Sequence, residues 1–244
     1  MNDPREEIIR TLEMQKEIFG DSLFSQREDF ENKGRDVVKI TKISEPSLGF
    51  SGEESFRSAQ SIDELNSLIC NCLKCPLGKG RNKFVFGTGD PQARVMVIGE
   101  GPGADEDAQG EPFVGRAGKL LTDILKAIKF ERSEVFIANI VKCRPPGNRT
   151  PASEEIDECF PYLEKQIELI NPKLILLLGA TAVFGLLKKK ESLGSFRGKV
   201  FYYGQAKVMV TYHPAALLRN PEWKRATWED VQAFRKLYDE IFPE

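Results

Sequence analysis

The stretch RVMVIGEGPGADEDAQGEPFVGRAG (residues 94–118) decides the fold. It begins with the apolar run Val95–Ile98, which is typical of a buried parallel strand, and Gly99 ends that run. A turn rich in glycine and proline follows, then an acidic loop, and the spacing predicts a helix that opens near Arg116. In an open α/β sheet, ligands bind beyond the carboxyl ends of the strands, so this turn is the first candidate for a site. Its glycines let the backbone approach a flat ligand closely, because they carry no Cβ.

A dinucleotide site is one interpretation of this turn, since residues 99–104 (GEGPGA) fit the pattern G-x-G-x-x-G/A. A pyrophosphate, however, binds where helix N–H groups and positive potential meet. The loop continues with four carboxylates, at Asp105, Glu106, Asp107 and Glu111, which would repel it. The pattern therefore favours a neutral planar ligand with carboxylates beside it.

Length and composition define the broad class. The 244 residues are enough for one domain of ordinary size with an appendage, and the net charge of −2 argues against a globally basic nucleic-acid binder. Contact with nucleic acid would have to come from a local basic patch. No apolar run approaches the roughly 18 residues of a membrane span, and the start MNDPREEIIR does not resemble a signal peptide. We expect a cytoplasmic monomer, associated with the nucleoid if it acts on DNA, and no contact with a membrane.

Apolar segments alternate with helical ones over most of the chain, which predicts a parallel sheet built from βαβ units. The predicted strands are 95–98, 135–141, 174–178 and 208–212, and the predicted helices are 115–128, 153–170, 180–187 and 227–241. Segments 85–88 and 199–203 could add edge strands. The expected fold is a single three-layer α/β/α domain over residues 59–244, with a mainly parallel four-stranded central sheet. Residues 1–58 are predicted to be a poorly ordered extension with a short amphipathic helix and a mobile linker.

Five cysteines in a chain without an export signal argue against a disulfide framework. Cys72 and Cys75 lie on one tight loop, and Cys143 and Cys159 form a second pair with fifteen residues between them. Four soft ligands in two pairs suit zinc or an iron–sulfur cluster. Buried, inert cysteines are the plain alternative. Cys70 is expected to lie outside the set, because three sulfurs within six residues would crowd one another.

Polar residues occur where the predicted strands end. Asn139 stands within an apolar strand, and a buried amide, which must find partners, could read the edge of a base or bond nearby backbone. His213, the single histidine, follows the last strand, so a zinc site with two histidines is excluded. Leu217 and Leu218 come next; they are core residues or, if exposed, a wedge of the kind inserted between bases. Phe113 is either a core plug or a stacking platform.

Taken together, these motifs resemble a known family. The combination of GEGPGADEDAQGEPFVGRAG, ANIVKCRPPGNR and YHPAALLRNP with the two cysteine pairs is similar to the family-four (iron–sulfur, type 4) uracil-DNA glycosylases. The resemblance covers the chain from about Leu65 to the C-terminus, and it is specific because three motifs and four cysteines occur in the expected order. Residues 1–58 lie outside it.

The resemblance implies a monofunctional enzyme of base excision repair that flips uracil out of DNA and hydrolyses its N-glycosidic bond, leaving an abasic site. It implies a structural [4Fe–4S] cluster held by Cys72, Cys75, Cys143 and Cys159. It also implies a uracil pocket in which Phe113 stacks on the ring, Asn139 reads the O4/N3 edge and His213 lies at O2. The remaining pocket residues are Glu100, Gly101 and Pro102.

The implied mechanism places His213 and backbone N–H groups at the anion that develops on the leaving base. A carboxylate would stabilise the sugar cation and position water; Glu106 is favoured, Glu100 is the second candidate and Asp107 a third. The better-known family-one enzymes carry an Asp at the place of Gly101. The residues expected to hold DNA are Leu217 as a wedge, with Arg219, Arg144, Asn148 and Arg149 on phosphates.

Other interpretations stay open at this point. Covalent trapping of uracil-DNA through a histidine is disfavoured, because segment 145–158 contains none. Family five has a different first motif, without a glutamate at position 100. A DNA-binding module that has lost catalysis and a zinc-dependent nucleotide-processing enzyme are the alternatives from other classes. The N-terminal extension could recruit a replication or repair partner.

Overall fold

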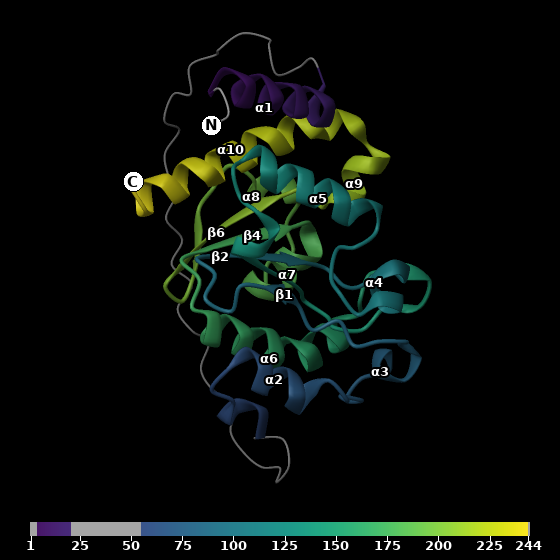
Figure 1. Ribbon diagram of the computed structural model, residues 1–244. Coiled ribbons are helices and arrows are strands. Elements are labelled where there is room, and N and C mark those ends of the chain that lie inside the picture. Colours follow the sequence, from purple (N-terminus) through teal and green to yellow (C-terminus); the bar gives the residue numbers. More distant parts are fainter. Residues whose placement is uncertain (1–3, 21–54, 244) are drawn as a thin grey trace.

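The computed structural model describes residues 4–20 and 55–243, in which helices and strands alternate (Figure 1). The strands are β1 (Thr88–Gly89), β2 (Val95–Gly99), β3 (Val135–Asn139), β4 (Leu174–Leu178), β5 (Phe201–Tyr203) and β6 (Ala206–Thr211). The helices are α1 (Pro4–Phe19), α2 (Ile62–Ile69), α3 (Leu77–Gly80), α4 (Ala104–Gln109), α5 (Arg116–Ala127), α6 (Ser153–Ile170), α7 (Ala180–Leu187), α8 (Leu193–Phe196), α9 (Pro214–Arg219) and α10 (Lys224–Ile241). Short 3-10 turns are η2 (Ser55–Ser58), η3 (Arg132–Glu134), η4 (Pro146–Asn148) and η5 (Pro221–Trp223).

Within the described residues the sheet has six strands in the order β1-β3-β2-β4-β6-β5. The four central strands are parallel, as predicted, whereas β1 and β5 pair antiparallel at the two edges. The predicted four-stranded centre is confirmed, and the segments 85–88 and 199–203, which could add edge strands, contain β1 at its first residue and β5 over most of its length. The order of connection reverses between β2 and β4, which is the switch point at which open α/β sheets bind ligands.

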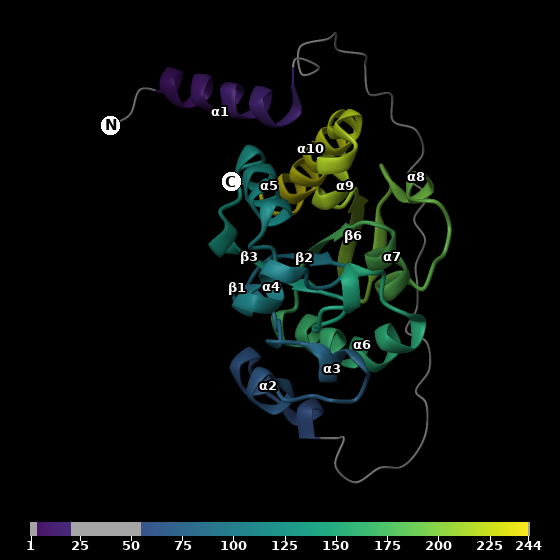
Figure 2. The same ribbon diagram turned by 90° about the vertical axis from the view of Figure 1, so that its right-hand side faces the viewer.

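Alternate residues of each strand face opposite sides of the sheet, and each side is covered by helices. Val95 and Val97 belong to a core formed with α5 and α10, while Met96 and Ile98 belong to a core formed with α6 and α7. Figure 2 shows α5, α9 and α10 on one side of the sheet and α6, α2 and α3 on the other. The predicted three-layer α/β/α class is confirmed. No helix in the described residues is long and apolar enough to cross a membrane.

The N-terminal helix α1 lies on the outer surface of α5 and α10 (Figure 1). Ile18 is buried in the core that these helices share, and the Gln15 side chain donates a hydrogen bond of 3.2 Å to the Ala127 carbonyl. The amphipathic helix predicted from the sequence is thus docked on the domain. The linker predicted after it lies outside the described residues over 21–54, and Phe56, which follows that gap, packs edge-to-face on Tyr162.

Short helices follow two of the parallel strands, and one of them stands where the sequence predicts an acidic loop. Gly103 precedes α4, and three acidic residues occupy the first turn of this helix. The positive end of the helix dipole stabilises their negative charges. Gly110 ends α4 in the left-handed conformation, with a φ of 85°. His213 precedes α9, whose first residue is Pro214. Both helices follow the carboxyl ends of parallel strands, so both face the candidate site.

Candidate active site

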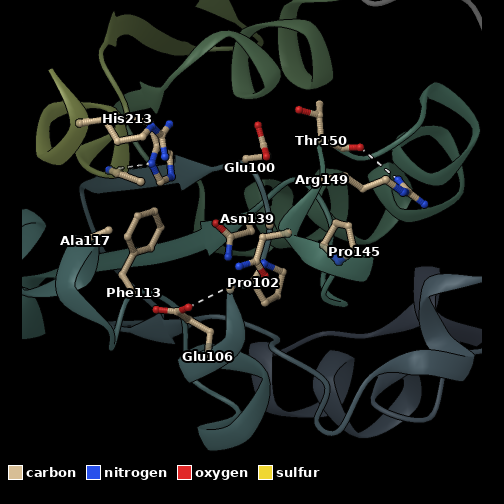
Figure 3. Close-up of a pocket in the computed structure, with 15 residues that line it drawn as sticks. Glu100, Pro102, Glu106, Phe113, Ala117, Asn139, Pro145, Arg149, Thr150 and His213 are labelled. Atoms are coloured by element: carbon tan, nitrogen blue, oxygen red, sulfur yellow. Dashed lines mark hydrogen bonds between the residues drawn. The ribbon is translucent and has the colours of Figure 1, made fainter.

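A pocket of about 380 Å³ opens at the carboxyl ends of the parallel strands (Figure 3). This volume lies in the range of small-ligand sites. The structure brings together all six residues expected to contact the base. The residues that line the pocket are Glu100, Gly101, Pro102, Gly103, Glu106, Phe113, Ala117, Asn139, Pro145, Asn148, Arg149, Thr150, His213, Ala215 and Arg219.

Phe113 forms one wall of the pocket, and its backbone is in an unusual conformation. Its φ is 55°, a region that disfavours most side chains, so surrounding structure must hold it there. Two glycines make room: a Cβ at Gly118 would lie 1.9 Å from the Phe113 carbonyl oxygen, and one at Gly99 would lie 2.5 Å from its ring. The Phe113 and His213 ring centroids are 5.4 Å apart. The ring is thereby fixed as a flat wall beside the histidine.

Glu106 holds the loop that carries Phe113. One of its carboxylate oxygens accepts hydrogen bonds from the Val114 and Gly115 backbone N–H groups, at 2.9 and 3.0 Å. The other accepts from the Gly103 N–H at 3.0 Å. Hydrogen bonds to a charged acceptor are among the stronger ones in proteins. Because both oxygens are engaged, Glu106 acts here as a clamp between the start of α4 and the start of α5.

Asn139 ends β3 with its side chain buried beneath the pocket. Only 2% of the residue is exposed, and among the described residues its Oδ1 atom is one of two buried side-chain polar atoms without a hydrogen-bond partner. Buried polar groups nearly always have a partner, so this oxygen calls for a ligand N–H. A Cβ at Gly99 would lie 2.6 Å from Oδ1, which shows that glycine is needed to leave the amide its place.

His213 presents a neutral imidazole to the pocket. Its Nδ1 accepts a hydrogen bond of 3.2 Å from the Ala215 backbone N–H, which leaves Nε2 to carry the proton. Burial, reinforced by the positive charge of Arg219 and opposed by Glu106, lowers the pKa of His213 to about 4. At neutral pH the ring is therefore an uncharged donor through Nε2.

The three candidate carboxylates occupy different surroundings. Glu100 lines the pocket on the opposite side of Asn139 from Glu106 (Figure 3), and one of its oxygens accepts the Thr181 hydroxyl. No hydrogen bond to its other oxygen occurs within the described part of the chain. Asp107 is buried and accepts hydrogen bonds from the backbone and side chain of Asn82. Asp107 is not part of the pocket lining, so it is a structural residue rather than a third catalytic candidate.

Four cysteines line a second, smaller cavity beside α3 and α6: Cys72, Cys75, Cys143 and Cys159. Cys70 is not among its lining residues, and its thiol donates instead to the Ser67 carbonyl at 3.6 Å. The structure thus separates the four expected ligands from the fifth cysteine. No three His, Cys, Asp or Glu side chains of the described residues are arranged as a site for a single metal ion.

Hydrogen-bond donors point at three of these sulfurs. The Tyr162 hydroxyl lies 3.2 Å from Cys72 Sγ, an Arg81 guanidinium nitrogen lies 3.2 Å from Cys143 Sγ, and the Lys142 backbone N–H lies 3.3 Å from Cys159 Sγ. Burial raises the pKa of the Cys143 thiol and raises that of Cys159 to about 12. The nearby positive charges of Arg81 and Lys142 oppose this rise at Cys143 and Cys159, respectively.

Comparison with known proteins agrees with this geometry. Residues 86–233 match the family model described as the uracil DNA glycosylase superfamily. The chain belongs to this superfamily. A type-4 uracil-DNA glycosylase of Thermotoga maritima is 47% identical over 175 residues, which cover 70% of this chain and 91% of the relative. One of Pyrobaculum aerophilum is 44% identical over 182 residues, 71% of this chain and 92% of the relative.

These type-4 relatives are more similar to the chain than a type-5 relative is, as the motifs indicated. A type-5 uracil-DNA glycosylase of Pyrobaculum aerophilum is only 29% identical, over 64% of this chain and 83% of the relative. The segment that matches the family model, residues 86–233, contains every residue that lines the pocket.

The structure corrects the predicted DNA wedge of this uracil-DNA glycosylase homologue. Leu217 is fully buried in the core beside α5 and α10, so it cannot be the exposed wedge. Leu218, its neighbour, is 41% exposed. A six-residue helix has one face toward the domain and one toward solvent, and the packing of α9 on α5 turns Leu217 inward. The exposed apolar side chain of this helix is Leu218.

Three of the four polar residues expected at the DNA line the pocket, and the fourth contacts one of them. Arg219, Asn148 and Arg149 line the pocket, and Arg144 donates a hydrogen bond of 2.8 Å to Asn148. Arg149 makes a two-point ion pair with Glu155 at 2.7 and 2.8 Å. Its charge is already partly neutralised, so among these residues it has the least to offer a phosphate.

Two residues with a place in this site were missed by sequence reasoning. Thr181, which contacts Glu100, follows β4, the one central strand whose carboxyl end was not considered. Lys142 is fully buried, and its ammonium group donates to the Asn139 carbonyl at 2.9 Å and to the Gln166 side chain. The sequence carries a signal for Lys142: it is a lysine at the end of an apolar segment, directly before the candidate ligand Cys143.

Proposed function

We propose that this protein is a uracil-DNA glycosylase: it accepts a uracil flipped out of DNA and hydrolyses the N-glycosidic bond, leaving an abasic site for base excision repair. The observation that carries the proposal is the unpartnered Asn139 Oδ1, buried at the base of a pocket walled by a fixed aromatic ring. The names of the type-4 relatives support it.

Recognition of uracil follows from hydrogen-bond patterns. Asn139 Oδ1 would accept the uracil N3–H and its amide would donate to O4, while Phe113 stacks on the ring. Cytosine presents an acceptor at N3 and a donor amine at C4, the reverse pattern. With cytosine in the pocket, the Asn139 oxygen would face another acceptor and its amide N–H would face another donor. Such mismatches between buried polar groups disfavour binding strongly. The pocket therefore selects uracil over cytosine.

Departure of the base needs a donor at O2. Negative charge develops on uracil as the glycosidic bond breaks, and a preorganised donor in a partly desolvated site stabilises that charge. His213 Nε2–H is such a donor, since Nδ1 is already occupied by the Ala215 N–H. The imidazole acts as a neutral hydrogen-bond donor rather than as a charged acid.

A carboxylate must stabilise the sugar cation and position the attacking water. Sequence reasoning favoured Glu106, whose two oxygens bind three backbone N–H groups. We instead assign the positioning of the attacking water to Glu100, because one of its carboxylate oxygens has no hydrogen bond in the described structure. Glu106 becomes a positioning residue that holds Phe113 against the base. The pocket thus contains two carboxylates with separate roles.

A [4Fe–4S] cluster fits the cysteine cavity. Cys72, Cys75, Cys143 and Cys159 would hold it, and the cluster would tie together the loop before α3, the segment after β3 and helix α6. The three donors that point at these sulfurs support this assignment, because hydrogen bonds to sulfur ligands stabilise their negative charge. Zinc is the alternative for four thiolates.

Metal analysis distinguishes the two metals. Protein purified without oxygen should contain about four iron atoms per chain and be brown. Cys72→Ser should lose that iron, whereas Cys70→Ser, the matched control outside the cavity, should keep it. Zinc in place of iron would overturn the cluster assignment.

Contact with DNA would come from the surface around the pocket mouth. Leu218 is proposed as the apolar wedge, with Arg219, Arg144 and Asn148 on phosphates and Arg149 contributing least. The domain is proposed to act as a monomer. Phe56 belongs to the domain core, so the extension ends before residue 55 rather than at residue 58. This extension is proposed as an arm for a replication or repair partner that is not needed for excision.

The experiment that tests the function is base release from a labelled oligonucleotide with one uracil, scored after alkaline cleavage of the abasic site. A matched oligonucleotide with cytosine serves as the control. Wild-type holoprotein should release base only from the uracil strand, which alkali then cleaves, and Asn139→Ala and His213→Ala should lose most of the activity. A wild-type protein that binds uracil-DNA with its cluster intact and releases no base would establish the DNA-binding module instead.

A further inference from the structure

The Glu100 carboxylate is held by a residue from a different strand-helix unit. Glu100 follows β2 and Thr181 opens α7 after β4, and these strands are parallel neighbours with Ile98 opposite Leu177. The two residues therefore meet at the point where the connection order of the sheet reverses. The Thr181 hydroxyl donates to Glu100 Oε2 across a separation of 81 residues in sequence.

This contact uses the full donor capacity of Thr181. A hydroxyl has one proton, and here that proton goes to the carboxylate. A threonine inside a helix commonly donates to the carbonyl three or four residues before it, but the second residue of α7 has no such carbonyl within the helix. The β-branch also restricts rotation about χ1, so the hydroxyl is fixed in direction.

We propose that Thr181 is a positioning residue for the reaction: by binding one oxygen of Glu100, it aims the other at the sugar and the attacking water. The inference rests on the proposed glycosylase function. It assigns Thr181 no contact with the base, in keeping with its absence from the pocket lining. Without this hydroxyl, Glu100 would be free to rotate, and the fraction of time in the productive position would fall.

The plain alternative is that Thr181 only stabilises the start of α7. The structure disfavours it, because no side chain caps α7 and the Thr181 hydroxyl bonds to Glu100 instead. The two readings differ in what a hydroxyl deletion should change. A structural role would lower stability and leave the rate of the folded enzyme unchanged, whereas a positioning role would lower the rate and leave DNA binding unchanged.

The test compares Thr181→Val, which removes the hydroxyl at constant shape, with Thr181→Ser, which keeps it. Thr122→Val is the matched control, since that hydroxyl bonds the Gly118 carbonyl in α5 and does not line the pocket. Holoenzyme of each variant is assayed on uracil-DNA under single turnover with saturating enzyme, together with its dissociation constant for the same DNA. Thr181→Val should lower the rate about tenfold or more, as expected for loss of one hydrogen bond to a charged group. Its dissociation constant should stay within about twofold, and Thr181→Ser should restore most of the rate.

A double-mutant cycle makes the inference specific to Glu100. In a Glu100→Gln background, Thr181→Val should lower the rate no further, because the carboxylate on which it acts is gone. An equal loss in both backgrounds, or a Thr181→Val rate equal to that of Thr122→Val, would overturn the inference while the glycosylase function stands. A wild-type enzyme that releases no uracil would overturn both.

Discussion

Leu217 and Leu218 are neighbours on α9 with opposite surroundings, and truncating each should separate stability from DNA binding. Leu217 has no exposed surface and packs in the core beside α5 and α10, whereas Leu218 is 41% exposed. Leu217→Ala should lower the free energy of unfolding, because it leaves a cavity in the core. Leu218→Ala should not, because water already reaches that side chain.

The magnitudes follow from burial. A buried Leu→Ala change costs about 2–5 kcal/mol, while surface changes stay within about 0.5 kcal/mol. For a domain of this size, each kcal/mol lowers the unfolding midpoint by about 2–4 °C, so a loss of about 3 kcal/mol lowers it by about 6–12 °C. Thermal unfolding of the two holoproteins, followed by circular dichroism, gives both shifts.

The excision assay supplies the other half of the prediction. On duplex DNA with one uracil, Leu218→Ala should reduce kcat/KM with an unchanged unfolding midpoint, because a wedge helps to hold the base out of the stack. At a temperature where it is folded, Leu217→Ala should keep most of its activity. A large midpoint shift in Leu218→Ala, or excision lost in a folded Leu217→Ala while Leu218→Ala is fully active, would refute the assignment.

Three further predictions concern the pocket and the N-terminal helix. His213 is the single histidine, so one imidazole NMR signal should titrate near pH 4, with its lowered pKa; a midpoint near 6.5 would contradict the burial argument. Because the unfolded chain takes up this proton below about pH 6.5 and the folded chain only below about 4, the free energy of unfolding should fall over that window by up to about 3 kcal/mol. Glu106→Gln should raise KM about tenfold more than it lowers kcat, since it loses at least one charge-assisted hydrogen bond that holds the Phe113 loop; a loss confined to kcat would return the catalytic role to Glu106. Deletion of residues 1–54, which keeps Phe56, should retain excision and lower the unfolding midpoint by removing Ile18 from the core; loss of excision in the folded truncated protein would show that the arm takes part in catalysis.

The parallel sheet and most of the site were predictable because they depend on local pattern. Continuous apolar runs fixed the four central strands, and α6 and α7 begin and end at the residues that the spacing indicated. Parallel strands end at one edge, so the residues after β2, β3 and β6 had to converge. Spacing, together with the family resemblance, also distinguished the four cysteines of the cavity from Cys70.

The remaining features depend on contacts between distant segments. Leu217 faces inward because α9 packs on α5. The sequence shows only two adjacent leucines and cannot reveal which of them is buried. The choice between Glu100 and Glu106 depends on hydrogen bonds to Thr181 and to the loop after Phe113. The segment 104–109 is too short and too polar to show a helical period, so the sequence predicts a loop where the structure has α4.

The most direct test of the account is a crystal structure of the holoprotein with free uracil. The account predicts uracil stacked on Phe113, with N3 about 2.7–3.2 Å from Asn139 Oδ1 and O2 within hydrogen-bond distance of His213 Nε2. Uracil bound elsewhere, or bound here with its N3–H turned away from Asn139, would contradict the account.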